Sequence, residues 1–270
     1  MDEKEDIGPV QALVEQGLEH HRNGNLVEAG RCYATAVAMD SAHADAHNLL
    51  GLARMQAGDA EGALESVGAA VGLRPEIAHY HLSLGKARQA NDDLDGAIEA
   101  FEEAVRLDAD LIEAHNDLGN ALLANGDARR AIASYERALE VDPDYRLAAV
   151  NLANTLQGQG RFMEAERCYH RLLEKEPNNV EWRSSLAMVL GHRDRYEEAI
   201  EQCERARLHA PDDPVLVQRL LYFAAIAGRW GDHRAALGRL EDAQREELAE
   251  ALEGRGLTSE ARTCRGVTGN

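Results

Sequence analysis

Lysine, aromatic residues, proline and long hydrophobic runs are all scarce in this chain of 270 residues. Lysine and arginine together number 29 against 48 aspartates and glutamates, so the formal net charge is −19. This acidity argues against sequence-independent binding of nucleic acid, because such binding needs cations beside the phosphates. It also argues against binding to an anionic membrane surface. No apolar run of about 18 residues occurs, so we expect no membrane insertion.

Cysteine usage and the first residues bear on the compartment. The four cysteines are far apart and form no CxxC pair, and the start MDEKEDIGPV lacks the apolar stretch of a secretory signal. We therefore expect a reduced, cytoplasmic protein. Lysine occurs only at Lys4, Lys86 and Lys175 while arginine is abundant, which indicates GC-rich coding and a bacterial source.

Enzyme signatures are also missing, because the chain contains no GxxxxGK[ST], HExxH or GxSxG motif and no GxGxxG after a strand. We therefore expect no enzyme, with no catalytic residue, no cofactor and no metal. His47, His81 and His115 recur at one interval and could suggest a metal site. In stacked helices their axes would lie about 8–10 Å apart. Metal ligands must converge within about 2 Å of one ion, so a packing role is favoured.

The feature that dominates the sequence is a repeat of 34 residues. Six alanines keep this interval: Ala29, Ala63, Ala97, Ala131, Ala165 and Ala199. A period of this length predicts stacked helix–turn–helix units. We expect units at 10–43, 44–77, 78–111, 112–145, 146–179 and 180–213, followed by a degenerate unit at 214–246. Residues 1–9 are predicted to be a disordered acidic N-terminus, and 247–270 a helix extension with a flexible tail that includes an exposed Cys264.

The unit 112–145 shows why each residue type recurs. Its first helix is predicted to stop at Asn125-Gly126, where glycine takes the left-handed conformation that ends helices. Asp127 is a suitable N-cap for the second helix, and Pro143 ends that helix. Small residues are expected where the two helices cross, because a larger side chain would push the backbones apart.

These positions resemble the tetratricopeptide repeat (TPR) family, over about 10–246. The Leu-Gly pair stands at 50–51, 84–85 and 118–119, and the later alanine, aromatic and proline positions follow at the family's offsets. The resemblance implies an all-α, right-handed α-α superhelix, a TPR solenoid with six clear repeats plus a C-terminal cap. It also implies that the first helix of each unit lines a concave groove that binds a peptide or a partner domain, usually without catalysis.

By this resemblance we expect the groove to be formed by amides and apolar side chains. The candidate binding residues are Asn48, Leu52, Met55, Leu82, Lys86, Gln89, Asn116, Asn120, Asn154, Gln157 and Met188. An amide both donates and accepts, so a row of asparagines can hold the backbone of an extended peptide. Only Lys86 and Arg22 are counted as groove cations, so binding of an acidic C-terminal tail is not expected.

Three functions follow from these observations. The first is a non-catalytic scaffold or adaptor that binds a peptide segment or partner protein in the groove. The second is an accessory module that works with a separate glycosyl- or sulfotransferase. The third is a structural scaffold that self-associates through its terminal repeats.

Overall fold

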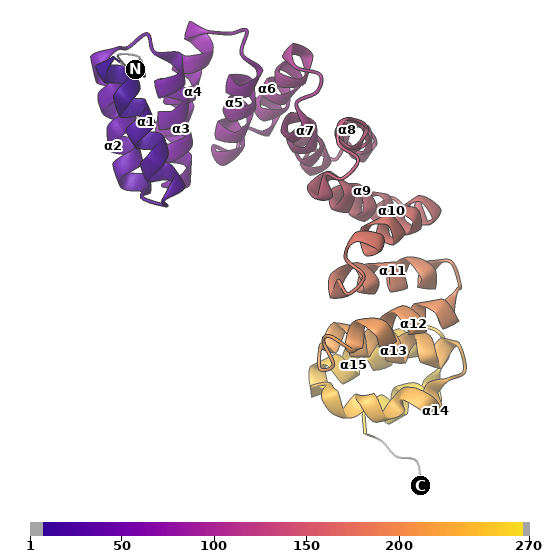
Figure 1. The fold of residues 1–270 in the computed structure, drawn as a ribbon. Helices are drawn as coiled ribbons and strands as arrows, with labels where there is room; N and C mark the ends of the chain where they lie inside the picture. Colours follow the sequence, from indigo (N-terminus) through magenta and orange to yellow (C-terminus); the bar gives the residue numbers. More distant parts are fainter. Residues whose placement is uncertain (1–7, 267–270) are drawn as a thin grey trace, which may run out of the picture. The chain divides into compact units, whose positions relative to one another are not determined.

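A computed structural model of the chain describes residues 8–266. Within that range every regular element is a helix, as predicted for an all-α solenoid (Figure 1). The elements are α1 Pro9–Arg22, α2 Leu26–Met39, α3 Ala44–Gln56, α4 Ala60–Leu73, α5 Ala78–Ala90, α6 Leu94–Leu107, α7 Ile112–Ala124, α8 Ala128–Val141, α9 Arg146–Gly158, α10 Phe162–Lys175, α11 Val180–His192, α12 Tyr196–Arg207, α13 Pro214–Ile226, α14 Trp230–His233, the 3-10 helix η1 Arg234–Arg239, α15 Asp242–Glu253 and α16 Thr258–Cys264.

The chain divides into two compact units, Met1–Ala148 and Ala149–Asn270, with the division inside α9. In the first unit α1 packs on α2, α3 on α4, α5 on α6 and α7 on α8, and each pair packs on the next. In the second unit α10 to α13 pack in succession. We call α1, α3, α5, α7, α9, α11 and α13 the first helices and their partners the second helices.

Small residues allow the two helices of a pair to approach closely. All six alanines at the 34-residue interval are 0% exposed. In the pair α7/α8 a Cβ atom on Gly119 would lie 2.5 Å from Cε1 of Tyr135, and in α5/α6 one on Gly85 would lie 2.4 Å from Cε1 of Phe101. The glycine therefore makes room for the aromatic ring of the second helix, as the spacing predicts.

The turn inside each pair depends on a residue with positive φ. Gly126 has φ 84° and ends α7, and Asp127 accepts a hydrogen bond from the Arg130 amide at 3.0 Å, as predicted. Asp92 and Asp194 occupy the same turn position with φ 59° and 58°. An L-residue other than glycine is strained in this region, because its Cβ approaches the following carbonyl oxygen.

Replacing Asp92 by glycine should therefore stabilise the protein. We expect Asp92→Gly to gain about 1 kcal/mol, the relief of backbone strain less the larger entropy of glycine in the unfolded chain. The Asp194 carboxylate also accepts a hydrogen bond from the Tyr196 hydroxyl at 2.5 Å, so Asp194→Gly should gain less. Urea unfolding followed by circular dichroism measures both, and a loss of stability in Asp92→Gly would contradict the presence of strain at this turn.

The three recurring histidines bind backbone oxygens. Nε2 of His47, His81 and His115 lies 3.0, 2.7 and 3.0 Å from the carbonyl oxygen of the residue six positions earlier. Each ring therefore fastens the first helix of its unit to the turn before it. Among the described residues no group of three or more His, Cys, Asp or Glu side chains is placed to hold a metal ion.

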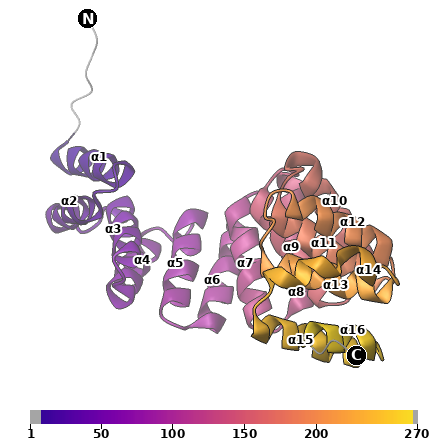
Figure 2. The ribbon, with the colours of Figure 1, turned by 90° about the horizontal axis from the view of Figure 1, so that it is seen from below.

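Up to Gly266 the C-terminal end differs from the expected flexible tail, and residues 267–270 of that prediction lie outside the described residues. Helix α13 is followed by the short α14 and η1, and then by α15 and α16 (Figure 2). Buried residues of α13, η1, α15 and α16 form one apolar cluster, which includes Leu221, Leu248 and Leu252. Cys264 is 1% exposed, and burial raises the pKa of its thiol to about 11. The prediction of an exposed thiol was wrong because Ala261 and Cys264 form the apolar side of a helix that packs on this cluster.

The N-terminal segment predicted to be disordered, 1–9, includes the first residue of α1. Residues 1–7 lie outside the described residues, whereas Pro9 is the first residue of α1. Within residues 8–266 no helix is both long and apolar enough to cross a membrane.

Candidate functional site

Most of the predicted groove residues lie on α3, α5 and α7 of the first unit. Leu82 and Asn116 are only 7% and 4% exposed, so we leave them out of the candidate site. Lys86 does not offer an unpaired cation, because its Nζ lies 3.3 Å from Oδ2 of Asp117. The other oxygen of Asp117 accepts a hydrogen bond from Asn116 Nδ2 at 3.1 Å.

The remaining first-unit candidates are partly accessible. Asn120 is exposed and its Oδ1 accepts a hydrogen bond from the Tyr135 hydroxyl at 2.9 Å. Half-buried positions are held by Asn48, Leu52, Met55 and Gln89. The Asn48 Oδ1 atom is buried and has no hydrogen-bond partner among the described residues. We do not assign these side chains a binding role.

The first helices of the second unit form a more definite site. A hollow of about 580 Å³ lies between α9 and α11 and is lined by Asn154, Gln157, Gly158, Gly160, Phe162, Ser185 and His192. We call it the amide hollow. The rings of Phe162 and His192 stack with a centroid distance of 4.6 Å and an interplanar angle of 5°, and they form one wall. The hollow therefore combines a flat aromatic side with amide and hydroxyl groups.

Tyr169 of α10 lies behind the amide hollow. Its side chain is 0% exposed, and its hydroxyl oxygen is 2.7 Å from Asn154 Oδ1 and 2.8 Å from Gln157 Oε1. Burial raises the pKa of this hydroxyl to about 12, while a hydrogen bond with Ser185 opposes the shift. The hydroxyl thus stays protonated at neutral pH and links three polar side chains of the hollow.

A second hollow, of about 450 Å³, adjoins the first between α11 and α13. It is lined by Val180, Glu181, Ser184, Ser185, Asp213, Val215, Leu216 and Arg219. We call it the arginine hollow. Arg219 donates a hydrogen bond from Nη1 to the Ser184 hydroxyl, and burial lowers the pKa of its guanidinium. Ser185 lines both hollows, so together they form a continuous strip along α9, α11 and α13.

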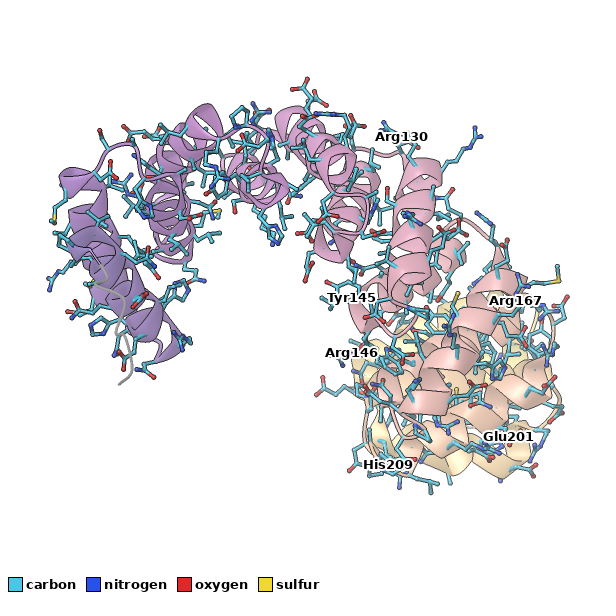
Figure 3. All side chains as sticks on the ribbon, turned by 45° about the horizontal axis from the view of Figure 1, so that its top comes forward. Arg130, Tyr145, Arg146, Arg167, Glu201 and His209 are labelled. Carbon is cyan, nitrogen blue, oxygen red and sulfur yellow. The ribbon has the colours of Figure 1, made fainter. Side chains whose placement is uncertain are left out.

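The chemistry of this strip suits recognition. It offers neutral donors and acceptors, one guanidinium, the carboxylates of Glu181 and Asp213, and apolar side chains that include Phe162 and Val215. Figure 3 shows the side chains of the described residues and labels Arg167 and Glu201, which are exposed on the second helices α10 and α12 and line neither hollow. The strip is therefore our candidate site on the first helices of the second unit.

Sequence reasoning found part of this strip and missed part. Asn154 and Gln157 were predicted and line the amide hollow, whereas Met188 is half-buried and lines neither hollow. Arg219 was missed because its unit, 214–246, was interpreted as a degenerate cap, yet its first helix α13 contributes to the strip. The count of groove cations from the sequence therefore omitted it. Phe162 lies in a second helix, where the groove analogy gives no signal.

The helix pairs, their small-residue crossings and their positive-φ turns define a solenoid of helix–turn–helix repeats. Comparison with family profiles identifies the family: tetratricopeptide repeat profiles match residues 14–75, 90–126, 122–189 and 156–222. The chain belongs to the tetratricopeptide repeat family, as the resemblance predicted. Among curated proteins, none matches the chain in sequence.

Several solved structures share this fold. The crystal structure of MamA shares 25% identity, covers 64% of this chain and 94% of its own, and has a TM-score of 0.55. YrrB, described as a TPR protein with an unusual peptide-binding site, shares 18% identity with coverages of 68% and 95% and a TM-score of 0.61. The pilF protein of Pseudomonas aeruginosa shares 17% identity with coverages of 77% and 94% and a TM-score of 0.66. The last two likenesses concern the fold.

Proposed function

We propose that this protein is a non-catalytic interaction scaffold that binds an extended peptide segment of a partner protein along the strip of α9, α11 and α13. One observation carries the proposal: two adjoining hollows on successive first helices share Ser185 and together offer hydrogen-bonding groups beside apolar surfaces. A peptide in extended conformation presents backbone donors and acceptors along its length, and it can use both hollows at once.

The family supports this proposal. TPR proteins bind peptide or protein partners and are typically non-catalytic. A peptide-binding site is stated for YrrB, which has the same fold. The cytoplasm and a bacterial source stay predictions from the sequence.

Self-association through the C-terminal repeat has less support than peptide binding. Val217, Leu221 and Ala225 of α13 are covered by the cluster with α15 and α16 of the same chain (Figure 2). A second copy stacking on that end would have to displace both helices. As an accessory module of a separate glycosyl- or sulfotransferase, the protein would bind its partner along the same strip. The identity of the bound partner would distinguish this role from that of a general scaffold.

Filling the shared position should abolish binding along the whole strip. Ser185→Trp places an indole where the two hollows meet, so we expect at least about a hundredfold loss of affinity through steric exclusion. The probe is a peptide selected against the full chain from a random dodecapeptide display library, and fluorescence anisotropy measures its affinity.

The matched control introduces the same side chain outside the strip. Arg167 is an exposed residue of α10, so Arg167→Trp should leave peptide affinity unchanged. Circular dichroism checks that both variants stay folded. Equal binding by Ser185→Trp and the wild type would refute the proposed surface, and a display selection that yields no binder would refute peptide recognition itself.

A further inference from the structure

The hydroxyl of Tyr169 has one hydrogen but two amide groups within hydrogen-bonding distance. Asn154 Oδ1 lies at 2.7 Å and Gln157 Oε1 at 2.8 Å. A single hydrogen shared between two carbonyl oxygens makes two bent, weaker bonds, whereas a hydrogen aligned with one oxygen leaves the other facing the tyrosine oxygen without a hydrogen between them. Turning the second amide by 180° removes this repulsion, because its NH2 group then donates to the tyrosine oxygen.

The preceding repeat assigns the donated hydrogen to Asn154. In that repeat the Tyr135 hydroxyl donates to Asn120, the residue equivalent to Asn154, at 2.9 Å. There the position of Gln157 is held by Leu123, which carries no amide. The Ser185 side chain also forms a hydrogen bond with the Tyr169 hydroxyl. Gln157 is then the amide that donates to Tyr169.

We propose that Tyr169 is a positioning residue that holds the amides of Asn154 and Gln157 in opposite orientations. The carbonyl of Asn154 and the NH2 of Gln157 face the hydroxyl, so the hollow receives the NH2 of Asn154 and the carbonyl of Gln157. The two residues are three positions apart on α9 and lie on one helix face.

This arrangement defines the ligand chemistry of the amide hollow. One donor beside one acceptor is complementary to the C=O and N–H groups of an extended peptide backbone, whereas a charged side chain needs groups of a single kind. The hollow therefore selects a peptide by its backbone, and side-chain preference falls to the Phe162–His192 wall and the arginine hollow. This inference rests on the proposed function and names its mechanism.

Other repeats show that the amide and the tyrosine hydroxyl occur together. In three other repeats the position of Tyr169 holds Phe101, Val67 or Cys203. The position of Asn154 in those repeats holds Lys86, Leu52 or Met188, respectively, and none of these is asparagine. Tyr33 is the exception, since it faces the position of Leu18 and its buried hydroxyl has no hydrogen-bond partner among the described residues. Tyr33 therefore provides a control tyrosine whose hydroxyl positions nothing.

The first experiment tests the orientation without any ligand. In NMR spectra of the full chain, nuclear Overhauser contacts of the two side-chain NH2 groups with the Tyr169 ring report which end of each amide faces it. We expect contacts from the Gln157 NH2 protons to the ring hydrogens beside the hydroxyl, and none from Asn154. Contacts from the Asn154 NH2 protons, or from both amides or neither, would overturn the assignment.

The second experiment measures how the hydroxyl acts on binding, with the dodecapeptide selected by display as the probe. Tyr169→Phe keeps the ring, as Phe101 does in its own repeat, and we expect about a five- to tenfold loss of affinity, the range of one hydrogen bond. Tyr33→Phe should leave affinity unchanged. In an Asn154→Ala, Gln157→Ala background, Tyr169→Phe should have no further effect, because a positioning residue acts only through the groups that it orients.

Changes in the peptide distinguish a failure of this inference from a failure of the proposed function. N-methylation of the peptide residue that contacts the hollow should weaken binding at least about tenfold, by removing one hydrogen bond and adding a clash, whereas alanine at the same residue should not. The proposed function stands if the peptide binds and Ser185→Trp abolishes binding. The positioning inference fails in that case if Tyr169→Phe leaves affinity unchanged, or if N-methylation is tolerated at every residue of the peptide. If no peptide binds, the proposed function fails, and the orientation of the amides is still decided by the NMR contacts.

Discussion

Gly119→Ala should destabilise the protein by about 1–3 kcal/mol, although alanine favours helix more than glycine does. The added Cβ would lie 2.5 Å from Cε1, 2.7 Å from Cδ1 and 2.9 Å from Cζ of Tyr135, which is 0% exposed. The ring cannot move without displacing its own neighbours, so α7 and α8 must separate. The next repeat holds Ala153 and Tyr169 at the corresponding positions, so a wider spacing is attainable and limits the cost.

The same substitution at Gly68 should have the opposite sign. Gly68 lies inside α4 and is exposed, and a Cβ atom added to it would have no other atom within 4 Å outside its own helix backbone and chain neighbours. Gly68→Ala should therefore stabilise by about 1 kcal/mol through helix propensity alone. Urea unfolding and hydrogen exchange of the α7 and α8 amides measure the difference. Equal stabilisation by the two substitutions would contradict the close packing of α7 against Tyr135.

Removing α15 and α16 should convert the chain into an associating species. Truncation after Leu240 would expose Val217, Leu221 and Ala225 of α13, which are at most 3% exposed in the full chain. Loss of the buried Leu248 and Leu252 alone removes about 2 kcal/mol each of hydrophobic stabilisation. Because a solenoid end without a cap presents a continuous apolar face, we expect a higher mass in light scattering and a lower melting temperature.

A shorter truncation is the control for this experiment. Ending the chain after Gly266 keeps the whole cluster and should leave mass and melting temperature as in the full chain. If truncation after Leu240 left both quantities unchanged, α15 and α16 would not function as a cap. If the full chain already self-associates and becomes monomeric on truncation, the result would instead favour the third predicted function, a structural scaffold that self-associates through its terminal repeats.

The sequence predicted the repeating part of the fold because each repeat is specified by local rules. Each of these rules has one physical reason, and it recurs at a fixed interval. Examples are the buried alanines, Gly119 packed against Tyr135, and Gly126 in the left-handed conformation. The C-terminal end could not be predicted in this way, because α15 and α16 follow no repeat and are fixed by contacts with α13. The buried Cys264 belongs to this non-repeating part.

The candidate site was predicted in part for a similar reason. Analogy with a repeat pointed to Asn154 and Gln157 by position, but it could not show that Tyr169 contacts both or that Lys86 is paired with Asp117. Those facts depend on side chains brought together from different helices. Arg219 was within reach of the analogy, since it lies on a first helix, and was missed because its repeat departs from the pattern elsewhere.

The proposed binding of an extended peptide along the strip of α9, α11 and α13 is tested by amide chemical-shift mapping on the full chain while the selected dodecapeptide is added. We predict that the largest changes fall on residues lining the two hollows, including Asn154, Ser185 and Arg219, with small changes on α10 and α12. Changes confined to the second helices, to the first unit or to α15 and α16 would show that the peptide binds elsewhere and that the strip is not the binding surface.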